Sequence, residues 1–109
     1  MITVVNRSYC KKLIAVLPGQ RHPAQFHKIK EETFHVLNGT LNLTVDGRRR
    51  VCRPGDVVTV MAGEVHEFDS DTGCVFEEIS STHIVEDSFY CDDVINKSTN
   101  RKTSLRYWL

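Results

Sequence analysis

The chain has 109 residues, 40% of them hydrophobic, so it can bury one modest core but is too short for two independently stable domains. Its 14 lysines and arginines balance 14 aspartates and glutamates, which argues against nucleic acid or an anionic membrane as a partner. We expect a single domain over residues 1–109.

Short runs rich in valine, isoleucine, threonine and aromatic residues are separated by turn pairs such as Pro18-Gly19 and Asp46-Gly47, roughly every 8–12 residues. This rhythm is typical of a β-sandwich or barrel, and no stretch shows helical periodicity. In chain order we expect strands at about 2–6, 9–17, 24–29, 32–37, 40–46, 49–53, 57–61, 65–69 and 74–80, with a last strand near 103–108.

Three segments need separate interpretation. Arg48–Arg50 follows a hairpin turn, which favours an exposed strand edge over a phosphate-binding patch. Residues 83–102 are polar and predict an irregular connection; one this long usually has a function or covers something. The chain ends on Tyr107-Trp108-Leu109, which could cap its own barrel or contact a second subunit. We expect a homodimer formed through these residues and the first strand.

The four cysteines are widely spaced, form no C-x-x-C pair, and lie in a chain without a secretory signal or a long apolar stretch. This pattern favours a reduced, cytoplasmic setting. Cys10, Cys52 and Cys74 lie in strand-like surroundings, where a free thiol behaves as a small core side chain. We assign no catalytic role to any of them.

Four polar residues occupy positions that strand periodicity brings together. Gln25 and His27 are two residues apart and share a face, and Glu32 starts the next expected strand with Phe34 on the same face. His66 follows the glycine turn at Gly63.

These two blocks resemble the cupin motifs G-x5-H-x-H-x3-4-E-x6-G and G-x5-P-x-G-x2-H. The resemblance implies a small all-β jelly-roll barrel in which Gln25, His27, Glu32 and His66 bind one divalent metal ion. Two positions depart from the motifs: Met61 replaces a proline, and Gln25 replaces a histidine. An amide oxygen is a weaker ligand than imidazole for these metals, so we expect weaker binding, with a cupin that has lost its metal as the alternative.

The remaining set of two histidines and one carboxylate leaves positions open for water or substrate and suits Fe(II), Mn(II), Co(II), Ni(II) or Zn(II). His22 has the opposite parity to His27, although Pro23 could turn it inward as a substitute ligand. His35 alternates out of phase with Glu32, so we expect it on the outer face or at an interface. We expect His83 to be exposed, with a role at the barrel mouth as the alternative.

Lys30 and Glu78 are the candidates for proton transfer, which needs groups close to the metal-bound substrate. Parity with Phe76 places Glu78 inward and Glu77 outward. The spacing H-x2-K-x-E, together with Glu78-Ile79-Ser80, is similar to that of cupin D-lyxose isomerases, and it implies that lysine and glutamate move protons while the metal polarises the sugar. The alternative for Lys30 is a solvated surface charge.

A wider resemblance is to the cupin domain of sialic acid synthase-like proteins. It is carried by the segments 9–13, 17–20, 26–34, 76–80, 87–90 and 101–103. It implies a role in sialic acid, nonulosonic acid or related sugar metabolism. Our leading hypothesis is a sugar isomerase or epimerase acting on a sugar or sugar acid. The alternatives are a non-catalytic sugar-binding or dimerisation module and an Fe(II) oxygenase.

Overall fold

The computed structural model describes residues 1–91, and regular structure in this part of the chain is almost entirely strand. The strands are β1 (Ile2–Asn6), β2 (Tyr9–Val16), β3 (Arg21–Phe26), β4 (Glu32–Gly39), β5 (Leu41–Val45), β6 (Arg48–Cys52), β7 (Val57–Val60), β8 (His66–Asp69), β9 (Cys74–Ser81) and β10 (Phe89–Tyr90). One short 3-10 helix, η1 (Val85–Asp87), precedes β10. Within residues 1–91, no helix is long and apolar enough to span a membrane.

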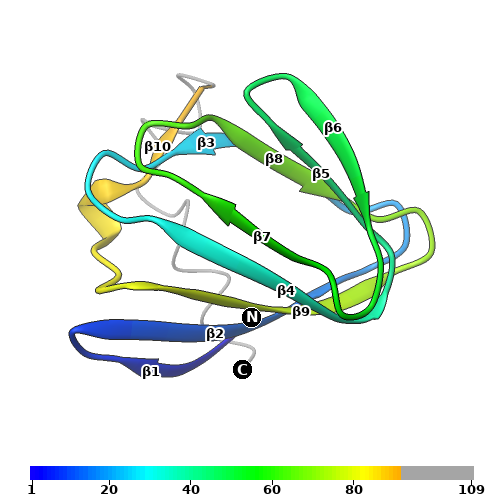
Figure 1. Ribbon diagram of the computed structural model, residues 1–109, viewed down its shortest axis with the longest axis horizontal. Helices are drawn as coiled ribbons and strands as arrows, with labels where there is room; N and C mark the ends of the chain where they lie inside the picture. The colour runs from blue at the N-terminus through cyan, green and yellow to red at the C-terminus, as the bar shows by residue number, and fades with distance from the viewer. Residues whose placement is uncertain (92–109) are drawn as a thin grey trace.

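The strands form two antiparallel sheets that face each other, as Figure 1 shows. The first has the order β1-β2-β9-β4-β7, and the second has the order β10-β3-β8-β5-β6. Side chains alternate between buried and more exposed along β9, as expected for strands with one face on a core. The expected all-β barrel of the jelly-roll type is confirmed.

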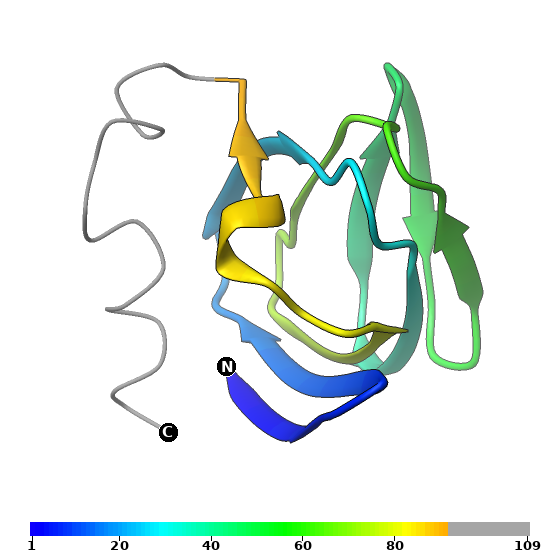
Figure 2. The ribbon, with the colours of Figure 1, turned by 90° about the vertical axis from the view of Figure 1, so that its left-hand side faces the viewer.

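The barrel interior changes from apolar to polar along its strands. On β9, Cys74 and Phe76 are buried in the hydrophobic core, whereas the next inward residues are Glu78 and Ser80. Strand β4 runs antiparallel to β9 and begins at Glu32, so its polar end lies at the same end of the barrel. Figure 2 faces this end, and the segment that leads from β9 into η1 runs across it. The polar end is therefore where chemistry can take place.

Gly39, the last glycine of the first motif, closes β4 against β9. Its φ of 76° lies in the left-handed region, and a Cβ at this position would collide with the backbone of Gly73 and Cys74. The motif therefore needs glycine here to let two strands approach closely.

The expected strand at 24–29 was placed wrongly, because β3 begins at Arg21 and ends at Phe26. Residues 27–31 form the connection between the two sheets instead. The other strands expected before residue 81 agree with the structure to within two residues at each end. The strand expected near 103–108 lies outside the described residues.

Of the irregular connection expected over residues 83–102, the structure describes residues 83–91, which run past the polar end of the barrel and contain η1 and β10. The remainder of this connection lies outside the described residues. Arg48–Arg50 is exposed on β6 at a sheet edge, as expected. Cys10, Cys52 and Cys74 are buried free thiols, also as expected. Strand β1 is an edge strand, but the terminal aromatic residues lie outside the described part, so the homodimer stays a prediction.

Candidate metal centre

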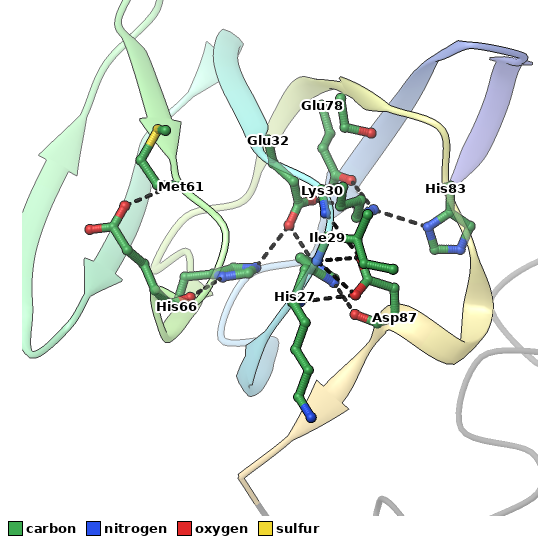
Figure 3. A network of polar contacts seen from close by, with 12 residues as sticks. His27, Ile29, Lys30, Glu32, Met61, His66, Glu78, His83 and Asp87 are labelled. Carbon is green, nitrogen blue, oxygen red and sulfur yellow. Dashed lines mark hydrogen bonds and ion pairs between the residues drawn. The ribbon is translucent and has the colours of Figure 1, made fainter.

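His27, Glu32 and His66 converge at the polar end of the barrel (Figure 3). Nε2 of His27 lies 2.5 Å from Oε1 of Glu32, and Nε2 of His66 lies 3.2 Å from the same oxygen. His27 directly follows β3, Glu32 begins β4 and His66 begins β8, so three separate elements position the group. All three side chains are at most 3% exposed.

The three converging atoms have no hydrogen-bond partner among the described residues. Buried polar atoms are almost always hydrogen-bonded, so orphans that point at one another need an explanation. Two imidazole nitrogens and a carboxylate oxygen are also a common ligand set for divalent transition metals. The residues therefore fit a metal ion, and this group could hold one.

A backbone carbonyl selects the tautomer of His27. Its Nδ1 lies 2.9 Å from the carbonyl oxygen of Asp87, which can only accept a hydrogen bond. Nδ1 of the neutral ring therefore carries the proton, and Nε2 presents its lone pair toward Glu32. The contact from Nδ1 of His66 to the carbonyl of Glu64 acts in the same sense but is longer, at 3.4 Å.

Asp87 also holds the loop from which His27 extends. Its Oδ1 accepts hydrogen bonds from the backbone N–H groups of Lys28 and Ile29 at 2.9 and 3.0 Å, and its Oδ2 accepts one from Lys30 at 3.0 Å. The side chain is buried. Sequence reasoning missed this residue, because nothing distinguished it from the other acidic residues of the same segment. Only the length of that segment signalled a function.

Strand pairing places Gln25 next to His66 of this group. Gln25 is buried and is paired directly with His66 between β3 and β8, so the two side chains leave the same face of the sheet. A shift in register between His22 and Gln25 makes this possible. The sequence interpretation of Gln25 as an inward residue is consistent with this placement.

The same irregularity turns His22 inward, as the alternative based on Pro23 anticipated. Its ring stacks on Phe68 with centroids 4.5 Å apart, within an aromatic cluster rather than within the converging group. His35 lies on the outer face, as expected, with Nδ1 2.7 Å from Oε1 of Glu77. Glu77 thus faces outward, and its neighbour Glu78 is buried inside.

Lys30 is only 2% exposed, so its interpretation as a solvated surface charge is wrong. Its Nζ lies 3.6 Å from Oε1 of Glu78 and 3.8 Å from Oε2 of Glu32. Nζ also lies 3.0 Å from Nδ1 of His83, which accepts from the ammonium. The expectation that His83 is exposed is wrong too, because its ring is half-buried against Lys30 (Figure 3).

The two carboxyl groups of the site have opposite tendencies to ionise. Burial, followed by the neighbouring carboxylate of Glu32, raises the pKa of Glu78 to about 8, against the opposing effect of Lys30. Burial alone would also raise the pKa of Glu32, but the neighbouring side chains of Glu78, His27 and His66 and the charge of Lys30 hold it well below its usual value. Without a metal ion, Glu78 is thus the protonated member of the pair at neutral pH.

The structure is thus a small all-β barrel with a buried His/Glu/His group at one end, which could hold a metal ion. The Cupin_2 family model, described as a cupin domain, matches residues 12–80. The chain therefore belongs to the cupin family.

Solved structures agree with this assignment. KdgF from Halomonas sp. superposes with a TM-score of 0.71 and 14% identity, over 77% of this chain and 78% of that one. A sugar phosphate isomerase of the cupin superfamily from Silicibacter pomeroyi has a TM-score of 0.65 and 23% identity, over 71% and 52% of the two chains. A protein from Acidithiobacillus ferrooxidans, provisionally assigned as a sugar phosphate isomerase, has a TM-score of 0.62 and 25% identity, over 72% and 52%.

Among curated proteins, a probable oxidoreductase of Penicillium expansum, patJ, is 45% identical over 47 residues. The match spans 42% of this chain but only 14% of that protein's length. It shows local similarity to a small part of a much longer protein.

Proposed function

We propose that this cupin is a metal-dependent sugar isomerase or epimerase. His27, Glu32 and His66 bind one divalent ion, with Gln25 as a weak fourth ligand or a partner of metal-bound water. Lys30 and Glu78 transfer protons. One observation carries the proposal: a buried lysine lies 3.6 Å from a buried carboxyl group and 3.8 Å from the glutamate of the candidate metal group.

The bound ion would act as a Lewis acid on the carbonyl and hydroxyl oxygens of the sugar. The chain's own residues would do the rest. Isomerisation moves a proton between neighbouring carbon atoms, which needs one group to accept a proton and one to return it. Glu78 and Lys30 can serve in these roles because both are buried at the polar end, where bulk water does not compete for the proton.

Three further observations support a role in sugar metabolism. The provisionally assigned sugar phosphate isomerase at 25% identity has the same fold. The motif around His27 and Lys30 resembles that of cupin D-lyxose isomerases, and the wider sequence resembles the cupin domain of sialic acid synthase-like proteins. The buried free thiols support the cytoplasmic location that we propose with this function.

Glu78→Gln is expected to lower turnover at least about 100-fold, because a general acid–base group typically contributes that much. The assay loads the protein with Mn(II), Fe(II), Co(II), Ni(II) or Zn(II) and follows deuterium incorporation from D2O next to the carbonyl of candidate sugars by NMR. Glu77→Gln is the matched control, because Glu77 is the neighbouring carboxylate on the outer face. Equal exchange by the two variants, or no exchange by the metal-loaded wild type with any sugar, would refute the proposal.

Gln25→His is expected to tighten divalent metal binding by about tenfold, or ~1.4 kcal/mol, because imidazole is a better ligand than an amide for these metals. Isothermal titration of metal-free wild type and variant with Zn(II) measures the difference. Unchanged affinity would place residue 25 outside the coordination sphere.

A second candidate is an Fe(II) oxygenase, favoured by the local match to a probable oxidoreductase and by a ligand set that leaves positions open. Oxygen consumption with Fe(II) and a candidate substrate separates the two, since an isomerase needs no oxidant. The non-catalytic module is the third possibility, and it predicts thermal stabilisation by a sugar without deuterium exchange.

A further inference from the structure

A second polar feature lies beside the candidate metal centre. A cavity of about 260 Å³ is lined by Thr3, Asn6, Lys12, His83 and Val85. It lies between the β1–β2 hairpin and the segment that leads into η1. None of its lining residues belongs to the metal group, but the ring of His83 contacts Lys30 at 3.0 Å. The cavity and the proposed proton-transfer pair therefore adjoin each other.

Lys12 is the unusual residue of this cavity. It is only 4% exposed, and it lies between Thr3 of β1 and Glu78 of β9 in the register of the first sheet. In the part of the chain that the structure describes, no hydrogen bond or ion pair satisfies its ammonium group within 4.0 Å. Burial lowers the pKa of Lys12. A buried cation without a direct partner is costly, and an anion in the cavity would offset that cost.

The neighbouring residue shows what an ordinary lysine of this strand does. Lys11 faces outward, and its Nζ lies 2.8 Å from Oε2 of Glu77. Lys11 is therefore exposed and paired, whereas Lys12 is buried and has no ion pair among the described residues. Strand pairing alone does not require a lysine on the inner face.

Hydrogen bonds between Asn6 and His83 hold the wall of the cavity in place. The side chain of Asn6 donates a hydrogen bond to the backbone carbonyl of His83 at 3.2 Å and accepts one from its backbone N–H at 2.9 Å. These two bonds fix the start of the covering segment against β1. With Nδ1 of His83 accepting from Lys30, the ring proton is on Nε2. The lining thus combines the cation of Lys12 with the hydroxyl group of Thr3, and both groups can bind an oxyanion.

We propose that this cavity binds the anionic group, a carboxylate or a phosphate, of the sugar whose carbonyl end lies at His27, Glu32 and His66. Lys12 is the charge partner of that group. This rests on the function proposed above and narrows its substrate class to acidic sugars. Lys12 on β2 and Glu32 on β4 are separated by the single strand β9, so the two ends lie roughly 10 Å apart across the sheet.

The test measures binding of inorganic phosphate and of acetate to the metal-free protein, so that neither probe can bind through an ion. Lys12→Met is compared with Lys11→Met, and binding is followed by chemical-shift changes of backbone amides. We expect wild type and Lys11→Met to bind at least one probe, with shifts centred on residues 3, 12 and 83. Lys12→Met should bind at least tenfold more weakly. Binding of phosphate alone would indicate a sugar phosphate, and binding of acetate alone a sugar acid.

Lys12→Met should fold, with a thermal midpoint no lower than that of wild type, because the substitution removes a buried unpaired charge. If Lys12→Met does not fold, Lys12→Gln is used in its place. Wild-type protein that binds neither probe, or equal binding by wild type and the Lys12 variant, would overturn the inference. Because the protein is metal-free and no turnover is measured, this result is independent of the Glu78→Gln experiment.

Discussion

Asp87→Ala is expected to lower the free energy of unfolding by about 3 kcal/mol, because a buried carboxylate that accepts several backbone hydrogen bonds is lost. The three N–H groups of residues 28–30 would lose their acceptor. The loop they belong to positions His27, so metal affinity should also fall, by about 10–100-fold as for other supports of a metal ligand. Urea denaturation and Zn(II) titration measure the two effects.

Glu86→Ala is the matched control, because Glu86 is the neighbouring acidic residue of η1 and is exposed. It should change neither stability nor metal affinity measurably. If Asp87→Ala lowered stability but left Zn(II) affinity at the wild-type value, Asp87 would support the fold without positioning His27. The imidazole 15N shifts of His27 provide a separate reading, because loss of the Nδ1 hydrogen bond changes the balance of tautomers.

Glu32→Gln is expected to abolish metal binding at micromolar metal, because Glu32 is the only anionic member of the converging group. In wild type, an ion at about 100 times its dissociation constant stabilises the fold by about 2.7 kcal/mol. For a domain of this size that corresponds to a rise in Tm of roughly 10 °C or more. EDTA should remove this gain from wild type, and the variant should show no gain to remove.

The substitution itself should be tolerated without metal, because the glutamine amide can donate to the ring nitrogen of His27, which is 2.5 Å from the present oxygen. Glu31→Gln is the control, since Glu31 is adjacent in sequence and exposed. A wild-type Tm that does not respond to any of the five divalent ions would contradict the metal site. Elemental analysis of the purified proteins checks the same point directly.

The sequence alone determined the barrel and most of the inward residues of the site. Alternation within an unbroken strand is a local property, so parity correctly placed Glu78 inside and Glu77 outside on β9. The motif spacing around Glu32 and His66 likewise identified the group that converges in the structure.

Parity could not place the residues outside regular strands. His27 and Lys30 lie in a connection whose shape depends on Asp87, which is 60 residues from His27 in the chain. His22 and Gln25 both face inward only because β3 shifts its register between them. No local pattern encodes either feature, since each depends on hydrogen bonds between distant segments.

The polar network at the end of the barrel was therefore decided only by the tertiary structure. Sequence periodicity describes which way a side chain leaves its own strand, but not which distant group meets it there. The contact of Lys30 with His83, and the cavity beside Lys12, arise because the segment after β9 folds back past the barrel end. The charged side chains at this end of the barrel are therefore buried away from bulk water. Burial changes their pKa values and strengthens their interactions, and this makes them a candidate site.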